Sequence, residues 1–80
     1  MAQLANLVLL LARSLVDEPE KVEVSGTESE SRVDLELRVA PDDMGKVIGR
    51  GGRTARALRT VVKAAGLRAG VRHTHVEIAD

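Results

Sequence analysis

The stretch VIGRGGRT, residues 47–54, combines three glycines with two arginines at the start of a predicted helix. The glycines are Gly49, Gly51 and Gly52, and the arginines are Arg50 and Arg53. Glycine lacks a Cβ atom, so a ligand can come close to the main chain, which can also adopt positive φ. Free N–H groups at a helix start favour a phosphate, and arginine adds charge-assisted hydrogen bonds to its oxygens. The stretch therefore predicts phosphate binding; the alternative is a helix–turn–helix corner that needs glycine only for its geometry.

The predicted helix that follows this loop has one wholly basic face. At about 100° per residue, the basic face carries Arg53, Arg56, Arg59 and Lys63, and the core-facing side carries Ala55, Leu58, Val61, Val62 and Ala65. Like charges three and four residues apart repel each other, and basic residues at a helix start oppose the helix dipole. A bound anion relieves both penalties. We therefore expect the loop and the basic face to form one site.

Two common phosphate-binding motifs do not fit this loop. The P-loop motif ends in Gly-Lys-Ser/Thr, which the loop lacks. The dinucleotide fingerprint G-x-G-x-x-G follows a strand, but a helix is predicted before this loop. Its third glycine would fall at position 54, which is Thr54. What remains is the pattern I-G-x-x-G between two helices.

Charge is segregated along the chain although the net charge is zero. Residues 46–72 contain eight basic and no acidic residues, whereas residues 1–45 contain ten acidic and four basic ones. The basic segment is a plausible footprint for a polyanion, and the neutral total argues against indiscriminate electrostatic binding. Because Phe, Tyr and Trp are absent, the chain cannot bind single strands by stacking bases on these side chains. The absence of cysteine excludes disulfides and thiol chemistry.

The hydrophobic pattern predicts the order helix, strand, strand, helix, loop, helix, strand. The predicted bounds are helix 2–16, strands 21–26 and 32–40, helices 41–48 and 53–65, and strand 71–79. In the first helix we expect a buried stripe of Leu4, Leu7, Val8, Leu11 and Leu15, and a surplus apolar flank of Ala5, Leu9, Ala12 and Val16. We expect Gly66 to end the last helix. Eighty residues suit a single domain, 1–80, of the α+β class.

The run DDMGKVIGRGGRTARALRTVVKAA resembles the signature region of KH RNA-binding domains, and the element order resembles their type II form, α-β-β-α-α-β. With HVEIAD at the end, the likeness to the small stand-alone bacterial KH proteins extends over essentially the whole chain. It implies a three-stranded mixed sheet covered on one face by helices. It also implies that residues 49–52 clamp the backbone of about four single-stranded nucleotides. The two middle positions of G-x-x-G are usually polar or basic in this family. Arg50 fits this pattern and Gly51 departs from it, so one side-chain contact with phosphate is missing or comes from Arg53.

The resemblance implies a site for single-stranded RNA without cofactor or catalysis. Its predicted residues are Lys46, Val47, Ile48, Gly49, Arg50, Gly51, Gly52, Arg53, Arg56 and Arg59. The bases are expected in an aliphatic groove between the two helices and the last strand. Candidates for its floor are Val47, Ile48, Ala55 and strand residues near His75, although Ile48 fits the core equally well.

The resemblance also suggests cellular roles and partners. We expect an RNA chaperone or post-transcriptional regulator that forms a homodimer, or a heterodimer with a larger multidomain KH-containing RNA-binding protein. The surplus apolar flank of the first helix is compatible with such pairing. Two alternatives stay open: a KH-fold interaction module whose RNA binding is incidental, and an enzyme subunit or small-anion binder that uses the same loop.

The sequence does not point to a metal site, a catalytic site, a signal peptide or a membrane span. His73, His75 and Glu77 share a predicted strand face, but this spacing with no fourth ligand is typical of a solvated face rather than a metal site. The serines lie far from both histidines in sequence, so no catalytic arrangement is indicated. The opening apolar run lacks the flanks of a signal peptide, and no segment approaches a membrane span of about 18 apolar residues. We expect a cytoplasmic protein.

Overall fold

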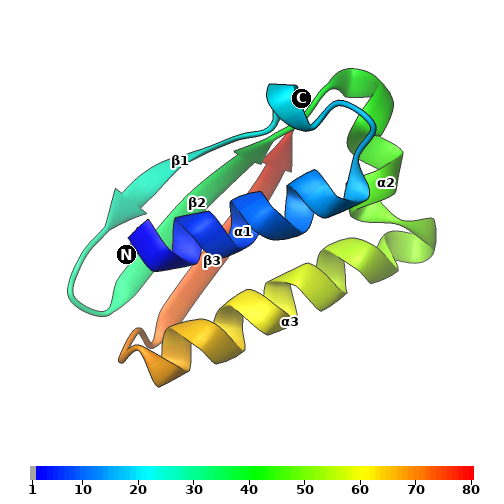
Figure 1. Cartoon of the computed structure of the whole chain (residues 1–80). Helices are drawn as coiled ribbons and strands as arrows, with labels where there is room; N and C mark the ends of the chain where they lie inside the picture. Colours follow the sequence, from blue (N-terminus) through cyan, green and yellow to red (C-terminus); the bar gives the residue numbers. More distant parts are fainter. Residues whose placement is uncertain (1) are drawn as a thin grey trace.

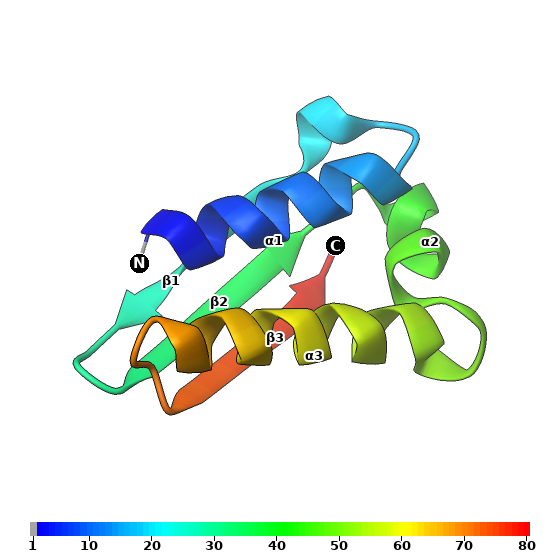
Figure 2. The same ribbon diagram turned by 60° about the horizontal axis from the view of Figure 1, so that its bottom comes forward.

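In the computed structural model, which describes residues 2–80, helices cover one face of a three-stranded sheet (Figures 1 and 2). The elements are α1 (Ala2–Leu15), β1 (Glu23–Glu28), β2 (Arg32–Arg38), α2 (Met44–Ile48), α3 (Arg53–Arg68) and β3 (His73–Ala79). Short 3-10 helices span Pro19–Lys21, Pro41–Asp43 and Arg50–Gly52. The predicted element order and the α+β class are confirmed.

The sheet is mixed, with the strand order β1-β2-β3. β1 pairs antiparallel with β2, and β3 pairs parallel with β2, so that Leu35 lies between Gly26 and Val76. In the central strand Val33, Leu35 and Leu37 are buried, while the charged residues between them are not. This alternation arises because only one face of the sheet is covered by helices.

The face of α1 that contacts the core agrees with the predicted stripe at Leu4 and Val8 and differs from it at Ala12 and Leu15. Leu4, Val8 and Ala12 are buried, whereas Leu15 is 39% exposed. Ala12 belongs to the flank that was predicted to be surplus, and the other members of that flank also pack against the core. Since α1 is apolar around most of its circumference, its periodicity alone cannot fix the buried face. The contact with the sheet and α3 selects it.

Several predicted bounds also shift. The first strand begins at Glu23 rather than residue 21, because Pro19–Lys21 forms a 3-10 turn, and it continues to Glu28. α3 runs past Gly66 to Arg68, so this glycine does not end the helix. Gly66 is buried in the helix interior, where an added Cβ would lie 2.7 Å from the Thr74 Cγ2 atom. A close helix–strand contact therefore explains this glycine.

Candidate nucleic-acid interface

The loop of residues 49–52, which we call the G-x-x-G loop, joins α2 to α3 at one end of the molecule (Figure 1). The Gly49 N–H donates to the Gly45 carbonyl at 2.9 Å and ends α2. Gly49, Gly51 and Gly52 have φ of 76°, 66° and 78°. Gly51 and Gly52 have ψ of 18° and 13°, in the left-handed helical region that costs side-chain-bearing residues about 1–2 kcal/mol each. Gly49 has ψ of 170°, in a region that essentially only glycine adopts, so this loop shape depends on all three glycines.

The three glycines differ in what surrounds them. Gly49 packs against Thr54, which fills the space that a side chain would need. Among the residues that the structure describes, and apart from each glycine's own chain neighbours, no atom lies within 4 Å of a Cβ added at Gly51, and the nearest to one added at Gly52 is the Arg56 Nη2 atom at 4.0 Å. The second half of the loop therefore presents a bare main chain to open space, into which a ligand backbone can move.

The amides of this loop are partly used within the protein. The Gly52 N–H donates to the Gly49 carbonyl at 3.1 Å, which removes one donor from the predicted anion site. Among residues 2–80, the amides of Arg50 and Gly51 donate to no other backbone group. The Arg56 Nη2 group donates to the Gly51 carbonyl at 3.1 Å and braces the loop from α3. Two loop amides thus remain for an anion.

A groove between α3 and β3 begins next to this loop. It is lined by Arg56, Arg59, Thr60, Lys63, Thr74, His75 and Val76. Its basic wall comes from α3 and its other wall from the edge strand β3, and the Arg59 Nε group donates to the Val76 carbonyl at 3.1 Å. Because Arg56 contacts the loop and also lines the groove, the two form a continuous surface.

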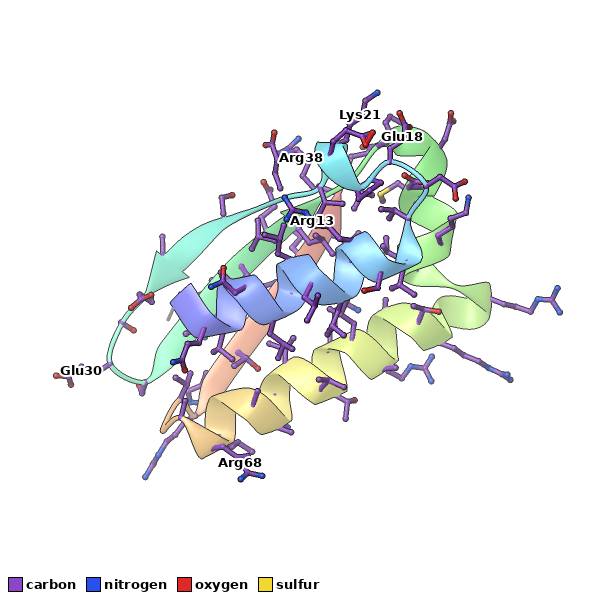
Figure 3. All side chains as sticks on the ribbon, viewed as in Figure 1. Arg13, Glu18, Lys21, Glu30, Arg38 and Arg68 are labelled. Carbon is purple, nitrogen blue, oxygen red and sulfur yellow. The ribbon has the colours of Figure 1, made fainter. Side chains whose placement is uncertain are left out.

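The basic side chains of this surface have no acidic partners nearby. In the part of the chain that the structure describes, no carboxylate lies within 4.0 Å of the basic groups of Arg50, Arg53, Arg56, Arg59 or Lys63. The ion pairs that do form lie elsewhere, for example between Lys21 and Glu18 (Figure 3). The uncompensated positive charge is therefore concentrated at the loop and groove, where it favours a polyanion.

The structure brings most of the predicted site residues together but separates two of them. Val47 is fully buried in the core, so its side chain cannot contact a ligand and instead anchors α2. Lys46 forms an ion pair with Asp17, and this hydrogen bond raises the pKa of Lys46. Ile48 is 36% exposed at the end of α2 and can still form part of the site. Ala55 is buried and cannot form the groove floor.

The ten predicted site residues do not include Thr60, Lys63 and Thr74, which line the groove. The helical wheel places Lys63 on the basic face, so a signal for this residue was present. Thr74 carries no such signal, because its place depends on how β3 packs beside α3.

The two histidines lie on the solvent side of β3. His75 stands opposite Asp34, whose pKa is lowered mainly by its hydrogen bond from Arg32. Within residues 2–80, no group of three His, Cys, Asp or Glu side chains comes together as a metal site. Among these residues there is also no helix with the length and apolar character needed to span a membrane.

Two helices joined by a G-x-x-G loop, packed on a three-stranded mixed sheet in the order α-β-β-α-α-β, define a type II KH domain. The chain belongs to the KhpA/KhpB KH-domain family, whose family model matches residues 5–78. It is 56% identical over 63 residues to the RNA-binding protein KhpA of Clostridium perfringens, covering 79% of this chain and 84% of the relative. It is 50% identical over 72 residues to the RNA-binding protein KhpA of Aquifex aeolicus, covering 90% and 91%.

Two solved structures share the fold. The chain superimposes with a TM-score of 0.73 on Aquifex aeolicus Era bound to GDP and AlF4, covering 96% of this chain and 30% of Era. It superimposes with a TM-score of 0.71 on Era in complex with MgGDPNP and nucleotides 1506–1542 of 16S ribosomal RNA, covering 95% and 29%. The chain thus spans under a third of the Era chains. Because the sequence identity is 17% in both cases, the likeness shows the fold alone.

Proposed function

We propose that this protein binds single-stranded RNA along the G-x-x-G loop and the α3–β3 groove. The observation that carries the proposal is the open space beside Gly51 and Gly52, next to two amides that donate to no backbone group within residues 2–80. The uncompensated basic side chains around it supply the charge that a phosphate chain needs. The KhpA relatives are named RNA-binding proteins, which supports the same ligand.

In this proposal the loop holds the sugar–phosphate backbone and the groove holds the bases. A phosphate accepts hydrogen bonds from the amides of Arg50 and Gly51, and the Arg50 and Arg53 side chains neutralise its charge. Arg59 and Lys63 then lie along the path of the following nucleotides. A domain of this kind contacts about four nucleotides, so we expect modest sequence preference.

RNA binding with modest sequence preference and no catalysed reaction suits an RNA chaperone or a post-transcriptional regulator. We include this role, in the bacterial cytoplasm, in the proposal. Binding several sites on one RNA, through more than one copy of the domain, raises the overall affinity without any new contact. No bond-forming or bond-breaking step is needed.

The proposal can be tested by fluorescence anisotropy with a labelled single-stranded RNA and its duplex. We expect tighter binding to the single strand, with log K falling linearly with log salt by about 0.7 per phosphate contact. The same titration at two salt concentrations measures that slope. Equal affinity for strand and duplex, or binding no tighter than about 10⁻⁴ M, would rule out the RNA site and favour the interaction-module alternative.

A second role, assembly with another KH domain, is favoured by an apolar patch between α1 and α3. The patch is lined by Leu11, Ser14, Leu15, Thr54, Ala57, Leu58 and Val61. Val61 is 45% exposed, so its predicted place against the sheet is wrong. Physically, Val61 falls at the margin of the buried stripe of α3, where Ala55, Leu58 and Val62 already fill the space over the sheet.

We propose a second copy of this chain as the occupant of this patch. A two-fold axis can place the same α1–α3 surface against itself, which is the commonest interface in homo-oligomers. The patch and the α3–β3 groove share no lining residue, so one domain can bind RNA and a partner together. The alternative partner is a larger multidomain KH-containing protein, whose KH domain offers a surface of the same fold. An assembly experiment must distinguish this partner from a second copy of the chain.

A further inference from the structure

Asp43 is a buried carboxylate that the proposed RNA contacts do not use. Its exposed fraction is 1%, and among residues 2–80 it is the one charged residue in the buried class. Burying a carboxylate is costly unless hydrogen bonds or a positive charge compensate it. The position of this side chain therefore calls for specific partners.

Those partners lie 25 and 26 residues earlier in the chain. One carboxylate oxygen of Asp43 accepts the Asp17 N–H at 3.2 Å, and the other accepts the Glu18 N–H at 3.1 Å. The Lys46 Nζ atom stands 3.8 Å from the Asp43 Oδ1 atom and also pairs with Asp17. Asp43 thus joins the segment after α1 to the start of α2.

This use of Asp43 differs from the usual role of an aspartate at the start of a helix. Aspartates at a helix start are expected to cap their own helix or to favour its dipole. Asp43 does occupy the N-cap position of α2, but its side chain makes no cap hydrogen bond there. Both oxygens are directed to the distant backbone instead. The carboxylate therefore acts between elements rather than within one.

α2 needs such support because it has only five residues. An isolated helix of this length is not stable in water, so tertiary contacts must fix its direction. Val47 fixes α2 from inside the core, and Asp43 fixes its start. The G-x-x-G loop begins directly after α2, so any change in the direction of α2 moves the loop relative to the groove.

We propose that Asp43 is a positioning residue for the G-x-x-G loop: its buried carboxylate holds α2 on the segment after α1 and thereby aligns the loop with the α3–β3 groove. The consequence for RNA affinity rests on the proposed function. The consequence for the order of the loop is independent of any ligand.

The variant Asp43→Asn tests the proposal, and Asp42→Asn is its matched control. Both changes remove one negative charge, and Asp42 is exposed. Charge alone predicts equal or tighter RNA binding for both variants. At position 43 the asparagine amide would offer one acceptor oxygen and turn an NH2 group toward the second backbone N–H. We therefore expect Asp43→Asn to weaken RNA binding about tenfold, measured where circular dichroism shows it folded, while Asp42→Asn does not weaken it.

The result that overturns the proposal is an RNA affinity of folded Asp43→Asn equal to, or above, that of Asp42→Asn. Such a result means that the carboxylate contributes to stability only. Failure of the wild-type protein to bind RNA overturns the proposed function but not the positioning role, because the following measurement needs no RNA.

Native-state amide hydrogen exchange tests the positioning directly on the wild-type protein. The amides of Asp17, Glu18 and Gly49 all donate hydrogen bonds, so each reports on opening of its own segment. We expect these three amides to share one opening free energy, below that of Leu37 in the central strand. Two results overturn the proposal. In one, the Gly49 amide has the same opening free energy as Leu37; in the other, its opening free energy differs from the value that Asp17 and Glu18 share. This measurement remains decisive if Asp43→Asn does not fold.

Discussion

Gly49 and Thr54 are in direct contact across the G-x-x-G loop. A Cβ added to Gly49 would clash with the Thr54 Oγ1 atom and would lie 2.9 Å from the Thr54 backbone nitrogen. Gly51 has a similar φ, but within residues 2–80 only its own chain neighbours lie within 4 Å of its added Cβ. The loop therefore contains one glycine fixed by internal packing and another whose open side is available to a ligand.

This difference predicts unequal stability effects for the same substitution. Gly49→Ala combines positive φ with a clash against backbone, so we expect a loss of about 3 kcal/mol in the free energy of unfolding. Gly51→Ala has only the φ penalty, and we expect about 1 kcal/mol. Urea denaturation of both variants measures the difference. Equal losses at the two positions would contradict the distinction drawn between them.

Lys63, which is not among the ten predicted site residues, lines the groove, and this position gives a prediction of its own. We expect Lys63→Met to weaken binding to single-stranded RNA several-fold and to reduce the slope of log K against log salt by about 0.7, since one phosphate contact is lost. Arg68→Met is the control, because Arg68 lies at the far end of α3 from the loop (Figure 3) and does not line the groove. Equal slopes for Lys63→Met and the wild-type protein would remove Lys63 from the RNA path.

The apolar patch predicts that Val61→Asp abolishes self-association while the fold is retained. A charge at this half-exposed position cannot be buried in an interface without a partner, but it stays hydrated in the free protein. Analytical ultracentrifugation of wild-type and variant protein at equal concentration measures the effect. Leu67→Asp serves as the control, since Leu67 is also exposed on α3 but does not line the patch. A wild-type protein that sediments as a monomer over the whole concentration range contradicts the second-copy proposal.

Much of the fold could be predicted because its local signals are strong. The strict alternation in β2 and the glycine-rich loop between two helices each point to one structure. The basic face of α3 is equally clear, because the basic residues from Arg53 to Lys63 follow the helix period without an acidic residue among them.

Other features depend on contacts that no local pattern encodes. The buried face of α1 was predicted correctly at Leu4 and Val8 but not at Ala12 and Leu15, because two apolar stripes overlap on that helix and only the contact with the sheet decides between them. Gly66 is typical of a helix end, yet it makes room for Thr74 of the neighbouring strand. Asp43 is typical of a helix start, yet its partners are the amides of Asp17 and Glu18. In each case a residue distant in sequence determines the role.

The most direct test of the account is RNA binding by the double variant Arg50→Asp with Gly51→Asp. It places two negative charges on the exposed part of the loop, where the phosphate is proposed to lie, and leaves the buried core unchanged. The control Arg68→Asp with Ala69→Asp makes the same change in charge at the opposite end of α3. Anisotropy titration with single-stranded RNA and thermal unfolding are measured for both. We expect the loop variant to lose RNA binding while it stays folded, with Tm lowered by about 4–8 °C through the positive φ at Gly51. We expect the control to retain most of its affinity, and wild-type affinity in a folded loop variant would contradict the account.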